Sequence, residues 1–308
     1  MLRIGTRGSK LALTQSEWIK KKIETKHPEV RVELLRIKTK GDKIPDSPLS
    51  KVGGKGLFVK EIEEALLDNR IDLAVHSIKD VPAELPDGLH LPVFPEREDP
   101  RDAFISKDNA GIHDLPRGAS VGTGSLRRSS QLLNLRPDLQ VVPLRGNVDT
   151  RLGRLESGDL HGIILAAAGL NRLGLSRRIS QYLSTDNFLP AIGQGSLGLE
   201  IRQDDEKVYN LLEFLNHKDT ETTVRAERAF LKELEGGCQV PIAAFGTLDK
   251  DNLTLKGLVA ELDGSRILKY EMNGPPDDPE ETGIALAEKL LEAGAREILD
   301  RIYGLHSS

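Results

Sequence analysis

The chain opens with residues 2–37, LRIGTRGSKLALTQSEWIKKKIETKHPEVRVELLRI, and this stretch indicates the fold class. Leu2 to Ile4 is short and apolar, which predicts a strand. Ser9 is placed to cap a helix, in which small and apolar residues recur at helical spacing from Ala12 to Ile23. Val32 to Ile37 predicts a second strand. This β-α-β order predicts a parallel sheet with helices packed on it.

Arg7 and Ser9 lie in the predicted turn between the first strand and the first helix. Ligands of open α/β sheets bind beyond the carboxyl ends of the strands. The N-terminus of a helix also favours an anion, because its free N–H groups and its dipole are positive there. The turn therefore predicts an anion contact for Arg7, with an ordinary solvated arginine as the alternative.

A second group of polar residues follows the buried strand predicted for Ile71 to Val75. Residues 76–82, HSIKDVP, place His76, Lys79 and Asp80 at the carboxyl end of that strand. Each has a structural alternative: a hydrogen-bonded core histidine, a solvated lysine and a turn-capping aspartate. Their grouping at a strand end favours a functional site.

The segment from Lys40 to Gly56 is rich in Gly, Pro, Ser and Lys and has no apolar period. A loop of this length is usually functional. Gly56 follows Lys55 where a phosphate-binding Walker loop has Ser or Thr, so that class of site is excluded. Leu57 to Leu67 predicts an amphipathic helix after the loop.

The charge chemistry changes after a charged linker, Glu96 to Arg101. Between Asp108 and Glu206 there are eleven arginines and no lysine. Arginine is preferred over lysine where planar anions are held by two parallel hydrogen bonds. Several of these arginines follow predicted strands among Gly, Ser and Thr, which predicts a ligand with several carboxylates or phosphates. They are Arg127 and Arg128 after Ser125, Arg145, Arg151 and Arg172.

The same region predicts a second β-α series, and the chain beyond Asp219 predicts a third, different domain. Strands are expected at 103–105, 119–122, 140–142 and 162–165, with helices between them. In the third part a helix is expected at 221–234. Three strands with short turns (243–248, 253–259 and 267–272) and a helix from about 279 to 302 should follow. Consecutive strands with tight turns predict an antiparallel sheet covered by helix.

Cys238 is the only cysteine, and it stands in Glu235-Gly236-Gly237-Cys238-Gln239-Val240-Pro241. The glycines and the proline predict a turn that presents the thiol, whereas a lone cysteine is more commonly a small buried apolar residue. One cysteine cannot form an internal disulfide and fits a reducing compartment.

Composition and spacing exclude several other classes of function. A net charge of −5 and 4% aromatic residues argue against a nucleic-acid partner. No apolar run is long enough for a membrane span, and no signal peptide is visible, so a cytoplasmic protein is expected. The histidines lack metal-ligand spacing, so no metal is expected. The GxGxxG letters from Gly193 to Gly198 fit a strand better than the start of a dinucleotide-binding helix.

Taken together, the motifs resemble those of the porphobilinogen deaminases, also called hydroxymethylbilane synthases, over essentially the whole chain. The matching segments are 6–9 (TRGS), 53–61 (GGKGLFVKE), 76–82 (HSIKDVP), 124–128 (GSLRR), 145–152 (RGNVDTRL), 168–174, 190–195 (PAIGQG) and 235–241 (EGGCQVP). Several of these are specific to the family, and they occur in order.

The resemblance implies a transferase of tetrapyrrole (haem-type) biosynthesis. It would condense four porphobilinogen molecules head to tail into hydroxymethylbilane and release ammonia at each step. It implies a dipyrromethane cofactor held by a thioether to Cys238, which primes the chain and does not turn over. Each pyrrole carries an acetate and a propionate, which would account for the arginines. Asp80 matches the essential aspartate, which would stabilise the cation formed as ammonia leaves.

The resemblance also implies roles for the other site residues. Cofactor-binding residues would be Lys79, Ser125, Arg127, Arg128 and Arg151, and substrate-binding residues would be Arg7, Ser9, Arg145 and Arg172. The loop from Lys43 to Gly56 matches a mobile lid of the family.

The fold implied is two periplasmic-binding-protein-like α/β domains plus a small α+β domain. The expected limits are residues 1–95 with 196–214 for domain 1, residues 101–189 for domain 2, and residues 218–308 for domain 3, which carries the cofactor cysteine. A monomer is expected. The alternative from another class is a non-catalytic, two-lobed binding protein for a polycarboxylate ligand, which needs neither Asp80 nor Cys238.

Overall fold

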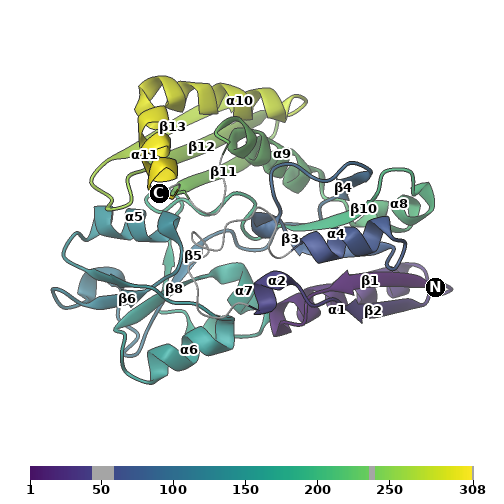
Figure 1. Cartoon of the computed structure of the whole chain (residues 1–308), viewed down its shortest axis with the longest axis horizontal. Helices are drawn as coiled ribbons and strands as arrows, with labels where there is room; N and C mark the ends of the chain where they lie inside the picture. The colour runs from purple at the N-terminus through teal and green to yellow at the C-terminus, as the bar shows by residue number, and fades with distance from the viewer. Residues whose placement is uncertain (44–58, 236–239, 307–308) are drawn as a thin grey trace.

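The computed structural model describes residues 1–43, 59–235 and 240–306. Three β-sheets, each covered by helices, form three parts that meet at the middle of the molecule (Figure 1). The two α/β parts and the smaller α+β part confirm the predicted fold class. We call the sheet that contains the N-terminus and its helices lobe 1, the arginine-rich part lobe 2, and the C-terminal part domain 3.

Lobe 1 is built on a five-stranded sheet in the order β2-β1-β3-β10-β4. Its strands are β1 (Leu2–Thr6), β2 (Val32–Arg36), β3 (Leu73–Ser77), β4 (Leu89–Val93) and β10 (Leu197–Arg202). The helices are α1 (Lys10–Lys26), α2 (Lys40–Lys43), α4 (Lys60–Leu67) and α8 (Glu206–Leu212), with the short 3-10 turns η1 (Ile78–Asp80) and η4 (Glu213–Leu215). Ile19 and Ile23 of α1 fill the core on one face of the sheet, and Ile62 and Leu66 of α4 fill it on the other.

Lobe 2 repeats this arrangement with the strand order β7-β6-β8-β5-β9. Its strands are β5 (Asp102–Ser106), β6 (Ser120–Gly122), β7 (Gln140–Val142), β8 (Gly162–Ala166) and β9 (Gln181–Leu183). Its helices are α5 (Leu126–Leu135), α6 (Val148–Glu156) and α7 (Ala167–Arg172), with 3-10 turns η2 (Ile112–Asp114) and η3 (Ser176–Arg178). Leu132 of α5 packs on one face, and Leu152 and Leu155 of α6 pack on the other.

Domain 3 has an antiparallel sheet in the order β11-β12-β13. Its strands are β11 (Ile242–Asp249), β12 (Asn252–Ala260) and β13 (Ile267–Gly274), and its helices are α9 (Lys218–Glu233), α10 (Pro279–Leu290) and α11 (Arg296–His306). Phe230 of α9 and Leu286 and Leu290 of α10 cover one face of the sheet. The predicted antiparallel sheet under helices is therefore confirmed.

The structure differs from the sequence expectations at three places. First, neither α/β sheet is wholly parallel, because β10 runs antiparallel to β3 and β5 runs antiparallel to β8. Second, the sequence analysis did not predict β4 and β9, which lie at the sheet edges and are short. Third, the single C-terminal helix is interrupted by residues 291–295, where Gly294 adopts a φ of 104°, a conformation that favours glycine.

The linker from Glu96 to Arg101 is more than a charged surface segment. Arg97 Nη1 donates to Glu227 Oε1 of α9 at 2.6 Å, and Glu227 is fully buried. Glu227 also accepts from the backbone N–H of Gly193 at 2.6 Å and of Gly246 at 2.9 Å. One buried carboxylate thus joins both interlobe linkers to domain 3, and such a charge is tolerated because all its partners donate to it.

Within the described ranges, no helix is both long enough and apolar enough to span a membrane.

Candidate active site

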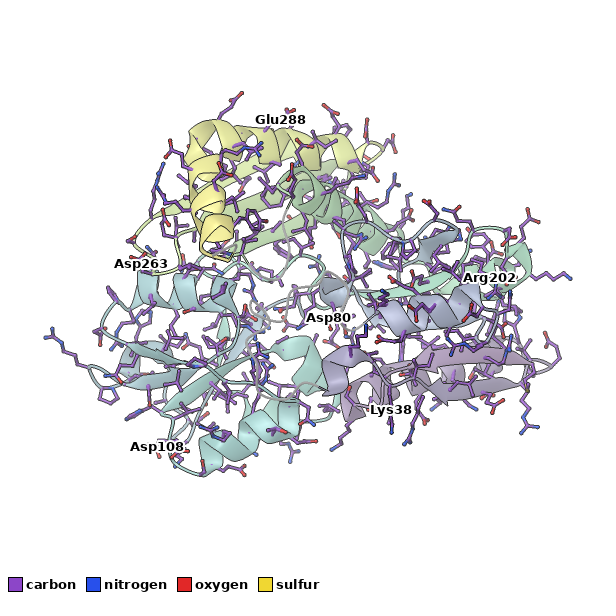
Figure 2. All side chains as sticks on the ribbon, in the orientation of Figure 1. Lys38, Asp80, Asp108, Arg202, Asp263 and Glu288 are labelled. Carbon is purple, nitrogen blue, oxygen red and sulfur yellow. The ribbon has the colours of Figure 1, made fainter. Side chains whose placement is uncertain are left out.

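Asp80 lies at the middle of the molecule, where the two lobes and domain 3 meet (Figure 2). The buried strand β3 runs to this point, and the 3-10 turn η1 follows it from Ile78 to Asp80. Ile78 is fully buried and fits against glycines: a Cβ on Gly193 would lie 2.1 Å from Ile78 Cγ2. Close packing of Ile78 therefore fixes the backbone that carries Lys79 and Asp80.

A cavity of about 30 Å³ adjoins Asp80, which is large enough to hold water. Arg7 of the β1–α1 turn and His76 of β3 line it together with Asp80. Gln15 of α1, which is buried, donates through Nε2 to Ser77 Oγ at 3.0 Å on the same wall. The two polar segments singled out in the sequence of lobe 1 therefore lie around one cavity.

The two serines predicted at the site both cap helices. Ser9 Oγ accepts from the Ala12 N–H at 3.3 Å at the start of α1, which confirms the predicted N-cap. Ser125 Oγ accepts from the Arg128 N–H at 3.5 Å at the start of α5. Each lobe thus presents a capped helix N-terminus after the strand next to its central strand, β1 or β6, and such ends favour anions.

Arg127 and Arg128 are buried and share one carboxylate, Asp102 of β5. Arg127 Nη1 donates to Asp102 Oδ2 at 2.7 Å, and Arg128 donates through Nε and Nη2 to Asp102 Oδ1 at 2.9 and 2.7 Å. The two guanidinium groups hold the pKa of Asp102 below its ordinary value despite burial. Two cations against one carboxylate leave an excess positive charge at this end of lobe 2.

Lys79 and Arg151 are affected by charges from both lobes. Burial, followed by the nearby guanidinium groups of lobe 2, lowers the pKa of Lys79 to about 8, although Asp80 opposes the shift. Burial and then Arg128 lower the pKa of Arg151 to about 10, again against Asp80. Arg145 adds to the shift of Arg151, whose Nε donates to Gly146 O at 2.8 Å. These mutual effects show that the cations lie within interaction range of one another and of Asp80.

Arg172 has different partners from the other predicted arginines. Its Nη2 donates to the carbonyl of Gly195 at 2.7 Å, across the interlobe junction. Burial lowers its pKa to about 10, and Glu98 opposes that shift. Its helix α7 packs on α1 of lobe 1. The structure therefore places Arg172 at the hinge between the lobes.

Sequence reasoning missed three residues that organise the site. Asp102 and Gln194 are polar and buried, and Gln194 Nε2 donates to Asp102 Oδ1 at 3.0 Å. Arg228 of α9 donates to the carbonyls of Pro82 and Ala83 at 2.8 and 3.0 Å, directly after the Asp80 turn. No local pattern marks these partners, because the residues in each pairing lie at least 25 positions apart in the sequence.

Two predictions fall on residues outside the described ranges. Cys238 lies in residues 236–239, and most of the predicted lid lies in residues 44–58. On the near side of the cysteine, α9 ends at Glu233, and the Tyr303 hydroxyl donates to the carbonyl of Glu235 at 2.9 Å. The segment that carries the cysteine therefore starts from an anchored helix end.

The fold and the site define a class of protein. It is a two-lobed α/β protein with a third domain, in which cationic side chains surround a site suited to an anionic small molecule. Among the described residues, six cations lie near the carboxylates of Asp80 and Asp102 in this candidate site: Arg7, Lys79, Arg127, Arg128, Arg145 and Arg151. The described part of the chain holds no cluster of three His, Cys, Asp or Glu side chains suited to a metal ion.

Comparison with known proteins identifies the family. A family model described as "Porphobilinogen deaminase, dipyromethane cofactor binding domain" matches residues 2–210, and one described as "Porphobilinogen deaminase, C-terminal domain" matches residues 221–292. The porphobilinogen deaminase of Geobacter metallireducens is 58% identical over 302 residues, 98% of this chain and 95% of the relative. That of Maridesulfovibrio salexigens is 55% identical over 98% of each chain. The chain belongs to the porphobilinogen deaminase family.

Two solved structures are also similar to this chain. A TRAP periplasmic solute-binding protein from Desulfovibrio salexigens has a TM-score of 0.43 at 13% identity, covering 71% of this chain and 73% of that chain. A YaeC-family lipoprotein from Enterococcus faecalis has a TM-score of 0.41 at 15% identity, covering 74% of this chain and 96% of that chain.

Proposed function

We propose that this chain is a transferase of tetrapyrrole biosynthesis that condenses four porphobilinogen molecules head to tail into hydroxymethylbilane with release of ammonia. The observation that carries the proposal is a group of six cations near the carboxylates of Asp80 and Asp102, within a chain that matches the family over nearly its whole length. A substrate with two carboxylates on every ring requires this excess of positive charge.

Asp80 is the proposed catalytic residue. Its carboxylate is positioned to stabilise the positive charge that develops on a pyrrole as ammonia leaves, and to accept pyrrole N–H groups. The rigid packing of Ile78 below it limits the reorganisation needed during the reaction.

The residues present fit a dipyrromethane cofactor. Burial and like charges lower the pKa values of Lys79 and Arg151, and bound carboxylates would relieve the like-charge part of those shifts. The cofactor supplies the free pyrrole end to which the first substrate is joined. We propose that Cys238, the only cysteine in the chain, holds it through a thioether. The residues proposed to bind its carboxylates are Lys79, Ser125, Arg127, Arg128 and Arg151.

The substrate would be bound by Arg7, Ser9, Arg145 and Arg172. Arg7 lines the cavity beside Asp80, which supports this role. Arg172 lies at the hinge, so its proposed contact with substrate would respond to the relative position of the lobes. We propose domain limits of 1–95 with 196–214, 101–189 and 218–308, in line with the three sheets. A cytoplasmic monomer is the proposed working form.

The experiment that tests this function is the mass and turnover of the Cys238→Ala variant. We expect wild-type protein expressed with porphobilinogen available to exceed the bare-chain mass by one dipyrromethane and to convert porphobilinogen into hydroxymethylbilane. The Cys238→Ala variant should have the bare-chain mass and no turnover. A wild-type mass equal to that of the bare chain, with reversible binding of substrate and no turnover, would instead support a polycarboxylate-binding protein.

A further inference from the structure

Three titratable side chains form a buried cluster next to the Asp80 cavity. His76 of β3 lines that cavity, and its Nε2 lies 2.7 Å from Glu200 Oε2 of β10. The exposed fractions of the two side chains are 4% and 0%. Glu63 of α4 is the third member, and it is also buried.

Sheet register explains why these residues meet. β3 and β10 are antiparallel, with His76 opposite Gly198 and Ala74 opposite Glu200. Residues two apart on a strand share one face, so His76 and Glu200 point to the same side of the sheet. Helix α4 packs on that side, as Ala74 and Ile62 belong to one core cluster. Glu63 is adjacent to Ile62 and is held there by the packing of its helix.

The cluster has too few partners to neutralise its two carboxylates. Among the described residues Glu200 Oε1 has no hydrogen-bond partner, although it is buried. Burial, and then the negative charge of Glu200, raises the pKa of Glu63 to about 7, while His76 opposes that shift. Glu63 therefore gains its negative charge as the pH rises through about 7.

Other charged groups act on this cluster from each element packed around it. They are Glu64 of α4, Asp80 of η1, His90 of β4, Arg228 of α9 and Arg7 of the β1–α1 turn. Glu64 lies on the exposed side of its helix, which makes it a matched control for Glu63.

We propose that Glu63, His76 and Glu200 act as one buried titrating unit whose charge sets the affinity of the adjoining site for its anionic substrate. They are positioning residues, because they act through the cavity that Arg7 and Asp80 line. When Glu63 is ionised, the excess positive charge of the site falls by one, and binding of a dicarboxylate weakens. This inference rests on the proposed role of the Asp80 site.

The test is the KM of porphobilinogen, measured with the purified holoenzyme between pH 6 and 7.5, below the range in which Lys79 loses its proton. We expect KM to rise about threefold over this range in wild type, with less change in kcat. Glu63→Gln should abolish the rise. Glu200→Gln should move it to lower pH, because the pKa of Glu63 falls without the neighbouring charge. Glu64→Gln should keep the rise and move it to lower pH by less than Glu200→Gln does, because Glu64 raises the pKa of Glu63 less than Glu200 does.

A second measurement separates a functional role from a structural one. Glu63 binds its proton more tightly when folded, so its contribution to stability is full below pH 4.5 and is lost as the pH rises through about 7. Unfolding midpoints from pH 5 to 8 should show this loss in wild type and not in Glu63→Gln. If that difference is present but both proteins show the same rise in KM, the proposal is wrong. Identical unfolding profiles would overturn it too.

A failure of the proposed function can be distinguished from a failure of this inference. Near-normal turnover of Asp80→Asn would refute the active site itself, whatever the KM values show. Loss of turnover in Asp80→Asn, together with an unchanged pH dependence in Glu63→Gln, would refute only the role of the buried cluster. If Glu200→Gln does not fold, Glu63→Gln and its Glu64→Gln control decide the question alone.

Discussion

Lobe 1 and lobe 2 use the same scaffold for different chemistry. In both, two strands lie parallel to the central one, and the fourth strand of the sheet runs antiparallel. In lobe 1 the third strand, β3, leads through His76 to Asp80. The equivalent strand of lobe 2, β8, is instead followed by the alanines at the start of α7. Lobe 1 thus supplies the carboxylate that we propose to be catalytic, and lobe 2 supplies guanidinium groups, of which those of Arg127 and Arg128 are buried.

The two lobes differ in how deeply their central carboxylates are buried. Asp80 is half-buried and borders a cavity, so it can act on a ligand. Asp102 is fully buried and holds Arg127 and Arg128 in place, so it acts on the protein. A charge change in lobe 1 should therefore alter turnover, and the matching change in lobe 2 should alter stability and cofactor loading.

The largest effect is expected for Asp80→Asn. Removal of the carboxylate should lower kcat about a thousandfold, because the charge that stabilises the developing cation is lost. The free energy of unfolding should change little, since Asp80 borders a cavity and the amide is isosteric. Turnover, intact mass and urea denaturation check this together. Activity within tenfold of wild type would remove Asp80 from the catalytic role.

Asp102→Asn should give the opposite pattern. Two buried guanidinium groups would lose their counter-charge, which should lower the free energy of unfolding by about 3 kcal/mol and reduce the fraction of chains that carry cofactor. Urea denaturation and intact mass measure these effects. Asp138→Asn is the matched control, because Asp138 pairs with Arg136 at a partly exposed position of the same lobe. Equal stability losses in the two variants would contradict the structural role of Asp102.

Arg228→Met tests whether domain 3 positions the Asp80 turn. The loss of charged hydrogen bonds to two carbonyls after Asp80 should lower kcat about tenfold, while the covalent mass stays that of the holoenzyme. Lys232→Met is the control one turn along α9, since Lys232 makes only an exposed ion pair with Glu84. A drop of the same size in both variants would show that any loss of charge on this helix face is enough.

The smallest effect is expected from the titration of Lys79. Its pKa of about 8 means that the positive charge is present at pH 7 and is lost as the pH rises through 8. KM for the dicarboxylate substrate should therefore rise about threefold between pH 7.5 and 9. Lys79→Arg should flatten this part of the profile, because a guanidinium stays charged. Lys60→Arg, an exposed change in the same lobe, should leave the profile unaltered.

Local patterns predicted the elements of the fold well and their pairing less well. Apolar runs located the strands of 102–166 to within two residues, and the cap signal at Ser9 was correct. The antiparallel placement of β10 and β5 was not readable from the β-α order, because it depends on which strands meet after the chain crosses between lobes. The kink at Gly294 also depends on a single residue within a continuous helical pattern.

The sequence alone determined which side chains we propose for the chemistry of this protein. The signals were local: a strand end followed by Asp80, strand ends followed by arginines without lysine, and a lone cysteine in a glycine turn. These features led to the family. Only the tertiary structure decided which charges are buried and what neutralises them. Asp102 between two arginines, Glu227 at the linkers and Glu63 beside His76 and Glu200 all depend on partners distant in sequence. Burial and long-range pairing control those charges, and no local pattern encodes them.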